Sequence, residues 1–532
     1  MKKLIVLLLI LSLCLTGCDY VGGVFEGIVS GAQNLFGGGD SADNVDSGSS
    51  DNIGSDPSDD VDCDHTDVDD DGYCDECLVS VVIIVDMYSV NDLHGKVNSG
   101  TSQPGIAGLT TYLKTVTDEN SVLISSGDMW QGSSESNLTH GELITEWMGE
   151  LGFSAMTLGN HEYDWSDEYI YANAELAEFP LLAINVYDKT TGERAEYATP
   201  SVVVSRGGIE IGIIGAIGDC YSSISGEVVG DFEFKVGREL TELVKAESER
   251  LKAEGVEFIV YSIHDGYGSS SSGVKHVSDR DISSYYDVAL SVDYVDVVFE
   301  AHTHQSYVLC DSKGTYHLQG GGENSGLSHA ALSYNIANEN KAVRSPEIIK
   351  SSVYGKMDAD PLIEELLLKY QNEISGAYDV LGTNARYLDD SEVEQIVADL
   401  YYRYGVEKWG DEYDIILGGG FIRTRNPYNL KRGEITYSDI YSLLPFDNEI
   451  VLCTISGRDL LRKFINTSNS DYYIAYGQND ISNIDQNKTY YVVVDTYTST
   501  YAYNNLTEVA RFGSGIYARD LFAEYIKEGG LS

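Results

Sequence analysis

The chain has 532 residues, enough for two or three domains that each enclose a hydrophobic core. Its 85 acidic and 34 basic residues give a formal net charge of −51, and 42% of the residues are hydrophobic. This composition is typical of a globular protein, and it argues against nucleic-acid binding, which requires a basic surface.

The first 18 residues have the pattern of an export signal. Lys2 and Lys3 precede an apolar run from Leu4 to Leu15, which is too short for an ordinary membrane-spanning helix. The run ends in LTGC, which resembles a bacterial lipobox. This resemblance implies removal of residues 1–17 and lipidation of Cys18, so that the protein is anchored to a membrane and faces out of the cytoplasm. An ordinary signal peptide with a chance cysteine is the alternative.

Residues 18–61 are rich in Gly, Ser, Asp and Asn, which predicts a flexible acidic tether. The following residues 62–78 form a small predicted module with two metal-binding patterns. One is the start of a calcium loop whose twelfth position is Leu78 instead of Glu, and the other is a possible zinc quartet. A spacer with one disulfide fits equally well. The residues of the two patterns are Cys63, His65, Asp67, Asp69, Asp71, Cys74 and Cys77.

Short β-branched runs alternate with helical stretches from residue 79 to residue 350. The predicted strands lie within 79–90, 121–128, 154–164, 179–186, 210–218, 257–265 and 295–305, and the predicted helices are 105–119, 141–151 and 237–254. Continuous apolar strands separated by helices predict an α/β fold in which helices cover the sheets. A helix is predicted at 360–374, within a linker of residues 351–375, and a second α/β region is predicted from 376 to 532.

The remaining internal cysteines show no dense disulfide framework. Cys220, Cys310 and Cys453 are far apart in the sequence, and we expect them to be single core residues.

Polar side chains follow five of the predicted strands directly. A single His after a strand is usually a hydrogen-bonded turn residue, but five such clusters in succession indicate one shared site at the strand ends. Carboxylate, imidazole and amide groups without cysteine suit Zn, Mn or Fe-type ions. Two such ions about 3.5–4 Å apart need a bridging carboxylate. The clusters comprise Asp92, His94, Asp128, Asn160, His161, His264, His302 and His304.

The order of these clusters (DLH, GD, GNH, H and AHTH) resembles the bimetal metallophosphoesterases, and specifically their 5′-nucleotidase branch. The resemblance implies a four-layer α/β/β/α sandwich followed by a smaller α/β domain. It also implies that one ion is held by Asp92, His94, Asp128 and His304, and the other by Asp128, Asn160, His264 and His302. His161 would contact the phosphoryl group, and Asp164 would orient His161 and keep it charged. Ala301 stands where the family usually has Gly.

Residues 415–461 resemble the C-terminal substrate-binding domain of the same branch. The resemblance implies that Arg423, after a Gly-rich segment, contacts the phosphate and that Phe446 stacks on a base. The second aromatic residue of the base sandwich is expected at Tyr501, with Tyr497 and Tyr503 as close alternatives.

Two departures from the family pattern concern this substrate side. Leu417 and Gly418 stand where the family commonly has Asn. The family also has a second phosphate-binding Arg upstream, expected near residues 386–394, where this sequence has only Arg386. Arg425 could compensate.

Together these features predict an extracytoplasmic, lipid-anchored hydrolase with two divalent ions (Zn, Mn, Co or Fe-type), in which metal-bound hydroxide attacks the phosphorus of a nucleotide. The expected partners are nucleotide substrates and, through the lipid alone, a membrane. A 2′,3′-cyclic phosphodiesterase and a sugar-nucleotide or dinucleotide pyrophosphatase are alternatives within the family. A nucleotide-binding lipoprotein without catalysis is the alternative from another class.

Overall fold

The structure is a computed structural model that describes residues 66–67, 72–73, 75, 80–98, 104–224, 230–278, 292–425, 429–467, 470–503, 505–513 and 515–531. The signal, the tether, Cys18 and, of the module, Cys63, His65, Asp69, Asp71, Cys74 and Cys77 lie outside the described residues. Residues from Cys63 to Ser532 form one compact unit.

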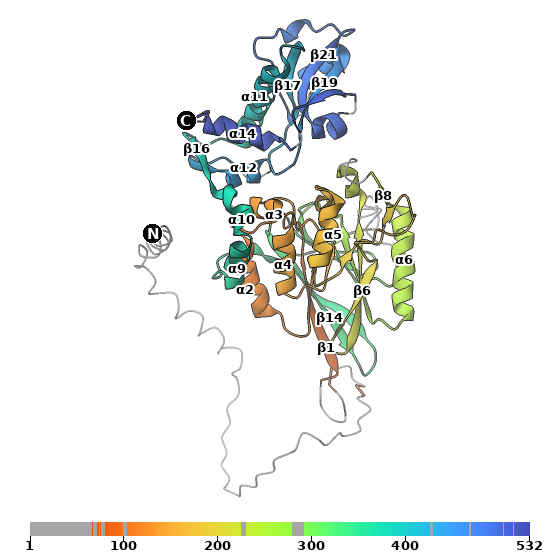
Figure 1. The fold of residues 1–532 in the computed structure, drawn as a ribbon. Helices are drawn as coiled ribbons and strands as arrows, with labels where there is room; N and C mark the ends of the chain where they lie inside the picture. Colours follow the sequence, from red (N-terminus) through yellow and green to blue (C-terminus); the bar gives the residue numbers. More distant parts are fainter. Residues whose placement is uncertain are drawn as a thin grey trace, which may run out of the picture. The chain divides into compact units, whose positions relative to one another are not determined.

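Two large sheets, with a two-stranded sheet of β5 (Val186–Asp188) and β8 (Phe232–Phe234), form the described part of this unit up to residue 350 (Figure 1). The first has the strand order β15 (Lys341–Lys350), β14 (Gly326–Asn335), β1 (Val82–Val90), β2 (Ser121–Ser125), β3 (Ala155–Thr157) and β4 (Leu181–Leu182). The second has the order β10 (Val274–His276), β12 (Ser306–Cys310), β13 (Tyr316–Gly320), β11 (Val297–Phe299), β9 (Phe258–His264), β7 (Ile209–Ile217) and β6 (Ser201–Arg206). Strands β1 to β4 are parallel to one another, as are β7, β9 and β11.

Successive side chains of the central strands point to opposite faces, and this alternation builds the layers. Tyr88 of β1 packs with helices on the outer face of the first sheet, whereas Met87 packs against the second sheet. The outer helices are α2 (Ile106–Val116), α4 (Glu142–Glu150) and α5 (Asp167–Leu176).

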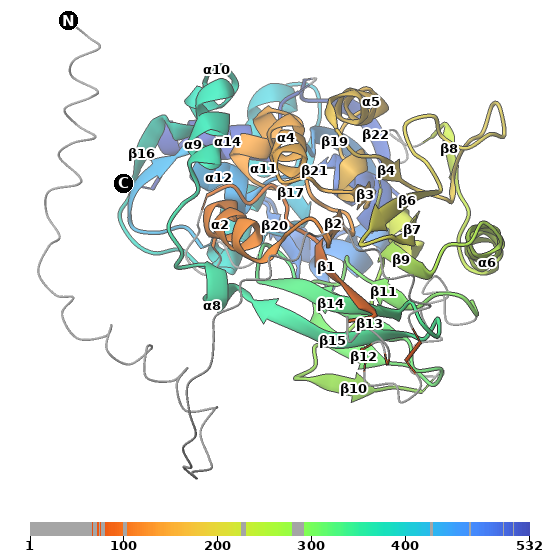
Figure 2. The ribbon, with the colours of Figure 1, turned by 90° about the horizontal axis from the view of Figure 1, so that it is seen from below.

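Helix α6 (Arg238–Ala253) lies along the outer side of the second sheet (Figure 2). Its Leu240 and Leu251 pack with Tyr261 of β9. The order of layers is therefore helix, sheet, sheet, helix, which confirms the predicted α/β/β/α sandwich.

Residues 351–378 hold a chain of short helices instead of the single helix predicted at 360–374. They are α8 (Ser351–Tyr354), α9 (Pro361–Lys369), α10 (Gln371–Ile374) and the 3-10 turn η3 (Ser375–Tyr378). Asp360 begins α9 by accepting the Leu362 N–H, and Pro361 occupies the first turn, where no intrahelical donor is needed.

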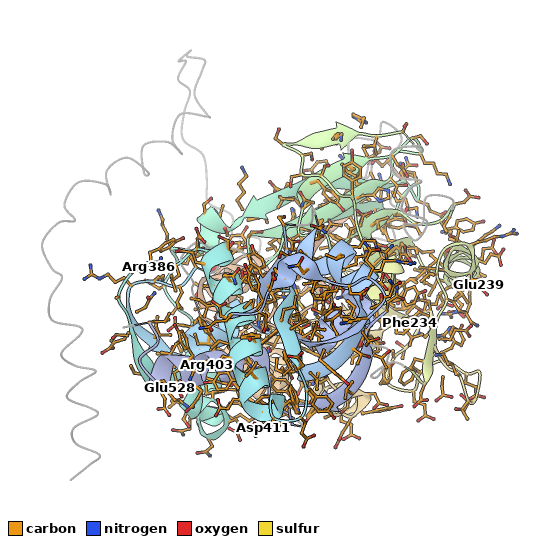
Figure 3. All side chains as sticks on the ribbon, turned by 90° about the horizontal axis from the view of Figure 1, so that it is seen from above. Phe234, Glu239, Arg386, Arg403, Asp411 and Glu528 are labelled. Carbon is orange, nitrogen blue, oxygen red and sulfur yellow. The ribbon has the colours of Figure 1, made fainter. Side chains whose placement is uncertain are left out.

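The residues after 378 build a second, smaller α/β structure. Its sheet has the order β20 (Tyr472–Ala475), β17 (Ile415–Phe421), β21 (Thr489–Asp495), β19 (Ile450–Ser456) and β22 (Thr507–Arg511). A two-stranded sheet, β16 (Val380–Asn384) with β18 (Gly433–Thr436), and helix α12 (Tyr437–Leu443) accompany it. Helices α11 (Asp390–Trp409) and α14 (Ala518–Lys527) pack together, and Arg403 pairs with Glu528 at 2.6 Å on their exposed side (Figure 3).

Cys220, Cys310 and Cys453 are buried and free of disulfides, as predicted for single core residues. Among the described residues, no helix has the length and apolarity needed to cross a lipid bilayer.

Candidate dinuclear metal site

The polar clusters predicted at strand ends lie at the carboxyl ends of β1, β2, β3, β9 and β11, so both sheets contribute to one site. Five of the candidate ligands adopt a left-handed backbone conformation, which is uncommon for residues other than Gly and occurs preferentially at functional sites. These residues are Asp92, His94, Asp128, His302 and His304.

Two glycines allow the loops after β2 and β3 to approach one another. Gly127 has φ +95°, and a Cβ atom there would lie 2.7 Å from the Gly159 nitrogen. A Cβ atom on Gly159 would lie 2.3 Å from Oδ1 of Asp128. The Gly residues of the GD and GNH motifs are therefore needed because the backbones nearly touch.

One group of ligand atoms comes from Asp92, His94 and His304, whose donor atoms lie within 4.8 Å of one another. The Nε2 atoms of His94 and His304 are 3.1 Å apart, and Nε2 of His304 is 3.6 Å from Oδ1 of Asp92. The Asn91 amide donates to Asp92 Oδ2 at 2.6 Å and holds that carboxylate in place.

The second group is centred on Asn160. Its Oδ1 lies 3.2 Å from Nε2 of His264 and 3.0 Å from Nδ1 of His302. Nε2 of His264 is also 3.0 Å from Oδ2 of Asp128. Asp128 approaches the first group through Nε2 of His94, at 3.9 Å. The geometry thus brings together all seven residues predicted as metal ligands, with Asp128 between the two groups.

The protonation of the imidazoles fits a pair of cations. Nδ1 of His94 donates to the Gln131 carbonyl at 2.9 Å, and Nδ1 of His264 donates to the Ser126 carbonyl at 2.8 Å. In each ring Nε2 then points into the cluster, as in known metal-ligating histidines. Burial opposes a charge on His264, but the Asp128 carboxylate outweighs burial and raises the pKa of His264 to about 10, so an ion there would take the place of the Nε2 proton. Donor atoms about 3–3.5 Å apart are what a tetrahedral ion with bonds of about 2.1 Å requires.

Two of the histidines are held in the neutral form that binds metals. Burial, followed by repulsion from His264, lowers the pKa of His302 to about 4. Burial and the positive charge of Arg425 lower the pKa of His304 to about 3. Neutral imidazole leaves a nitrogen lone pair available to an ion at neutral pH.

His161 differs from the ligands in its surroundings. Its Nδ1 lies 2.7 Å from Oδ2 of Asp164, and its backbone N–H donates to Oδ1 of Asp128 at 2.8 Å. Burial opposes a charge on this ring, but the nearby carboxylates of Asp164 and Asp128 outweigh burial and raise the pKa of His161. A carboxylate at Nδ1 fixes the ring orientation and directs Nε2 toward the space beside the metal ligands.

Glu162 is a supporting residue that the sequence analysis missed. Its buried carboxylate accepts the backbone N–H groups of Asp128 (2.8 Å), Met129 (2.7 Å), Trp130 (3.2 Å) and Gly159 (2.7 Å). It therefore ties together the two loops that carry Asp128 and Asn160. An acidic residue directly after GNH, at the end of an apolar run, was the available signal.

Gln319 of β13 supports the AHTH loop and was also missed. Its amide donates to the Ala301 carbonyl at 2.9 Å and accepts from the Thr303 hydroxyl at 3.0 Å and from the Gln305 N–H at 2.9 Å. No sequence signal distinguishes this residue, because its role depends on the pairing of β13 with β11.

On the substrate side, the two predicted arginines have different surroundings. Arg423 is exposed, whereas Arg425 is partly buried and its Nη2 donates to Oε1 of Gln131 at 3.3 Å. The guanidinium carbon of Arg425 lies 5.5 Å from the centre of the Phe446 ring, which in turn lies 5.8 Å from the ring of His161. Arg425 and Phe446 therefore lie beside the metal ligands.

The three candidates for a second stacking aromatic also differ. Tyr503 is buried against Phe464 and is a core residue, so this alternative is wrong. Tyr497 is partly buried and packs against Phe421, with ring centres 5.7 Å apart. The side chain of Tyr501 lies outside the described part of the chain.

The glycine-rich segment that precedes Arg423 is part of strand β17. A Cβ atom on Gly418 would lie 2.2 Å from the Tyr402 nitrogen in α11, and one on Gly419 would lie 2.1 Å from the Tyr473 carbonyl oxygen in β20. The glycines thus permit close packing of the helix and the neighbouring strand on β17.

Residues 375–479 match the family model of the 5′-nucleotidase C-terminal domain. The chain is 24% identical over 422 residues to a 5′-nucleotidase of Vibrio parahaemolyticus, with 70% of this chain and 72% of that protein covered. It is 27% identical over 428 residues to Endonuclease YhcR of Bacillus subtilis, with 72% of this chain covered but only 33% of that protein. The crystal structure of a 5′-nucleotidase precursor from Thermus thermophilus matches 84% of this chain and 96% of its own, at a TM-score of 0.62 and 18% identity.

The chain is a relative of the 5′-nucleotidases. This confirms the family and the hydrolase class that the motifs predicted, and the Thermus structure confirms the predicted fold.

Two positions in the 5′-nucleotidase C-terminal domain bear on the predicted departures. Leu417 is fully buried in the core of the sheet. Arg386 lies on the exposed surface (Figure 3). It pairs with Glu392 at 2.5 Å, and its guanidinium also donates to the Tyr387 carbonyl. Of the three arginines that the sequence singled out, Arg425 is therefore the one that lies beside the candidate metal ligands.

Asp67 is the one member of the predicted Cys/Asp module within the described residues. Its Oδ2 accepts from the Gly72 N–H at 3.1 Å and from the Asn335 amide at 2.8 Å. The first position of the predicted calcium loop therefore contacts β14.

Proposed function

We propose that the chain is a dinuclear-metal phosphoester hydrolase that acts on nucleotides. The observation that carries the proposal is the convergence of seven ligand residues from two sheets, with the His161–Asp164 pair beside them. A positioned imidazole held by a carboxylate can act on the leaving oxygen of a phosphate ester, which favours hydrolysis over binding alone.

Two divalent ions of the Zn, Mn, Co or Fe type, when bound, supply an activated water and neutralise the oxygens of a phosphate ester. Asp92, His94 and His304 would hold one ion. Asn160, His264 and His302 would hold the other, and Asp128 would contact both.

His161 would donate a hydrogen bond from Nε2 to a phosphoryl oxygen or to the leaving oxygen. Negative charge on these oxygens grows in the transition state, so a charged donor fixed in place lowers the barrier. Asp164 would keep the proton on Nδ1 and the ring in this orientation, at the 2.7 Å separation observed.

On the substrate side, we propose that Arg425 contacts the phosphate and that Phe446 contacts the base. The partly buried position of Arg425 next to Gln131, and the position of the Phe446 ring near His161, support this assignment. Arg423 is exposed and would contribute a longer-range charge. Tyr497 or Tyr501 would supply the second aromatic surface.

We further propose that the protein works outside the cytoplasm and is anchored through lipid on Cys18, because Lys2, Lys3 and the apolar run to Leu15 precede an LTGC sequence. Residues 18–61 would form the tether, 62–78 a small module that can hold calcium or zinc, 79–350 the catalytic domain, 351–375 the linker and 376–532 the substrate-binding domain.

A panel of substrates tests the proposal. The metal-free protein is loaded in turn with Mn, Zn or Co and assayed against AMP, UDP-glucose, NAD, 2′,3′-cyclic AMP and bis-p-nitrophenyl phosphate. Single-stranded and duplex DNA are included, because YhcR is named an endonuclease. We expect hydrolysis of a nucleotide that is lost on chelation. Cleavage of DNA alone, or of bis-p-nitrophenyl phosphate alone, would contradict the nucleotide assignment.

A further inference from the structure

The carbonyl oxygen of Pro445, next to Phe446, receives hydrogen bonds from two separate parts of the fold. Gln131 Nε2 and Asn137 Nδ2, in the segment that follows β2, each donate to it at 3.1 Å. Arg519 Nη1, at the start of α14, donates to the same oxygen at 3.4 Å and to the Phe446 carbonyl at 2.8 Å. Three donors on one carbonyl hold this short loop between the metal-binding segment and α14.

Arg519 is a rigid part of this arrangement. Its side chain is buried between the rings of Tyr441 and Tyr517, whose centres are 4.2 Å and 4.4 Å from the guanidinium carbon, and it also pairs with Asp447. Because these contacts lie within the C-terminal domain, Arg519 holds the loop but does not connect it to the metal ligands.

Gln131 makes that connection. It lies three residues after Asp128 and is 1% exposed. Its backbone carbonyl accepts from Nδ1 of the ligand His94 at 2.9 Å, its side-chain nitrogen donates to Pro445, and its side-chain oxygen accepts from Arg425 at 3.3 Å. One residue therefore contacts a metal ligand, the loop of Phe446 and the arginine beside the metal ligands.

We propose that Gln131 is a positioning residue that sets Arg425 and the Phe446 loop at a fixed place relative to the metal ligands. This inference rests on the proposed function, because it assumes that Arg425 and Phe446 bind substrate. An amide suits this role, since it offers a donor to the Pro445 carbonyl and an acceptor to the arginine at the same time.

Asn137 provides a matched comparison. It donates to the same Pro445 oxygen and, through Oδ1, accepts the Gly132 N–H at 2.7 Å, and among the described contacts its side chain is not bonded to Arg425. Gln131→Met removes the donor and the acceptor with little change in volume, whereas Asn137→Leu removes the contacts to Pro445 and Gly132 and leaves the acceptor for Arg425 in place.

The experiment is a double-mutant cycle with Arg425→Met, in the full-length protein loaded with the metal that gives the highest wild-type activity. KM and kcat are measured for the best nucleotide, bound metal is measured by elemental analysis, and the midpoint of thermal unfolding is recorded. We expect Gln131→Met to raise KM about tenfold, the size of one lost hydrogen bond to a charged group, with metal content unchanged.

In the Arg425→Met background, Gln131→Met should raise KM less than about threefold, because its partner is already absent and coupled residues do not add. Asn137→Leu should have the same effect in both backgrounds. Full additivity of Gln131→Met with Arg425→Met would overturn the inference, as would loss of metal from Gln131→Met, while leaving the proposed function in place. If the wild-type protein hydrolyses no phosphoester, the proposed function itself is contradicted.

Discussion

The metal side and the substrate side of the site are built in opposite ways. Each candidate metal ligand lies at or shortly after the end of a strand, and its orientation is set by contacts between neighbouring strand ends of the first α/β structure, such as the Ser126 carbonyl for His264. Arg425 and Phe446 instead lie in the second α/β structure and depend on contacts with the first, as between Arg425 and Gln131. The positions of the candidate metal ligands are thus set by the strand ends, whereas the positions of Arg425 and Phe446 depend on how the two α/β structures meet.

The largest effect is expected at Asp128, where both ligand groups meet. Asp128→Asn keeps the shape but removes the negative charge that would face both ions, so we expect bound metal to fall and activity to drop at least about 10⁴-fold. Elemental analysis and kcat/KM measure the two effects. Full activity in this variant would contradict the dinuclear mechanism.

A substitution at His161 distinguishes an effect on catalysis from an effect on metal binding. His161→Ala should lower kcat by about 10²- to 10⁴-fold because a charged donor to the phosphoryl group is lost, while the metal content stays at the wild-type level. Steady-state kinetics with elemental analysis is the check. Asp164→Asn should lie between wild type and His161→Ala, and a result below His161→Ala would show that Asp164 acts in another way.

Substitutions at Glu162 test how much the stability of the two loops that carry Asp128 and Asn160 depends on this carboxylate. Glu162→Gln keeps one acceptor oxygen for four backbone N–H groups, so we expect a loss of about 3 kcal/mol in the free energy of unfolding. Denaturant unfolding measures it. Glu162→Asp, which keeps the charge but shortens the side chain, is the matched variant, and an unchanged stability in both would refute the role assigned to this carboxylate.

The smallest effects are expected on the substrate side, and they distinguish two arginines. Arg425→Lys should raise KM for a nucleotide about 10-fold, because a lysine cannot reproduce the bidentate geometry of guanidinium. Arg423→Lys should change KM less than about threefold, since Arg423 is exposed. Initial-rate kinetics gives the KM of both variants. A larger increase in KM for Arg423→Lys than for Arg425→Lys would assign the phosphate-binding role to Arg423.

Much of the first α/β structure could be predicted from periodicity, because its strands are buried on both faces and read as continuous apolar runs. The predicted strand at 257–265 is β9 (Phe258–His264), and the predicted helix at 237–254 is α6 (Arg238–Ala253). The predicted helix at 360–374 is interrupted at Tyr370, where α9 ends and α10 begins. Strands β12 to β15 form two antiparallel pairs of strands adjacent in the sequence, and they were not predicted because segments such as KAVRSPEIIK of β15 contain no continuous apolar run.

The sequence by itself predicted which residues come together at the candidate metal site, because their side-chain types follow their strands at short, fixed spacings. It also determined that Asp164 lies three residues after His161 and can pair with it. Only the tertiary structure decided that Glu162 binds two loops, that Arg425 and not Arg423 is partly buried beside the candidate metal ligands, and that Tyr503 is a core residue. These features depend on contacts between segments far apart in the chain, and spacing along one segment carries no information about such contacts.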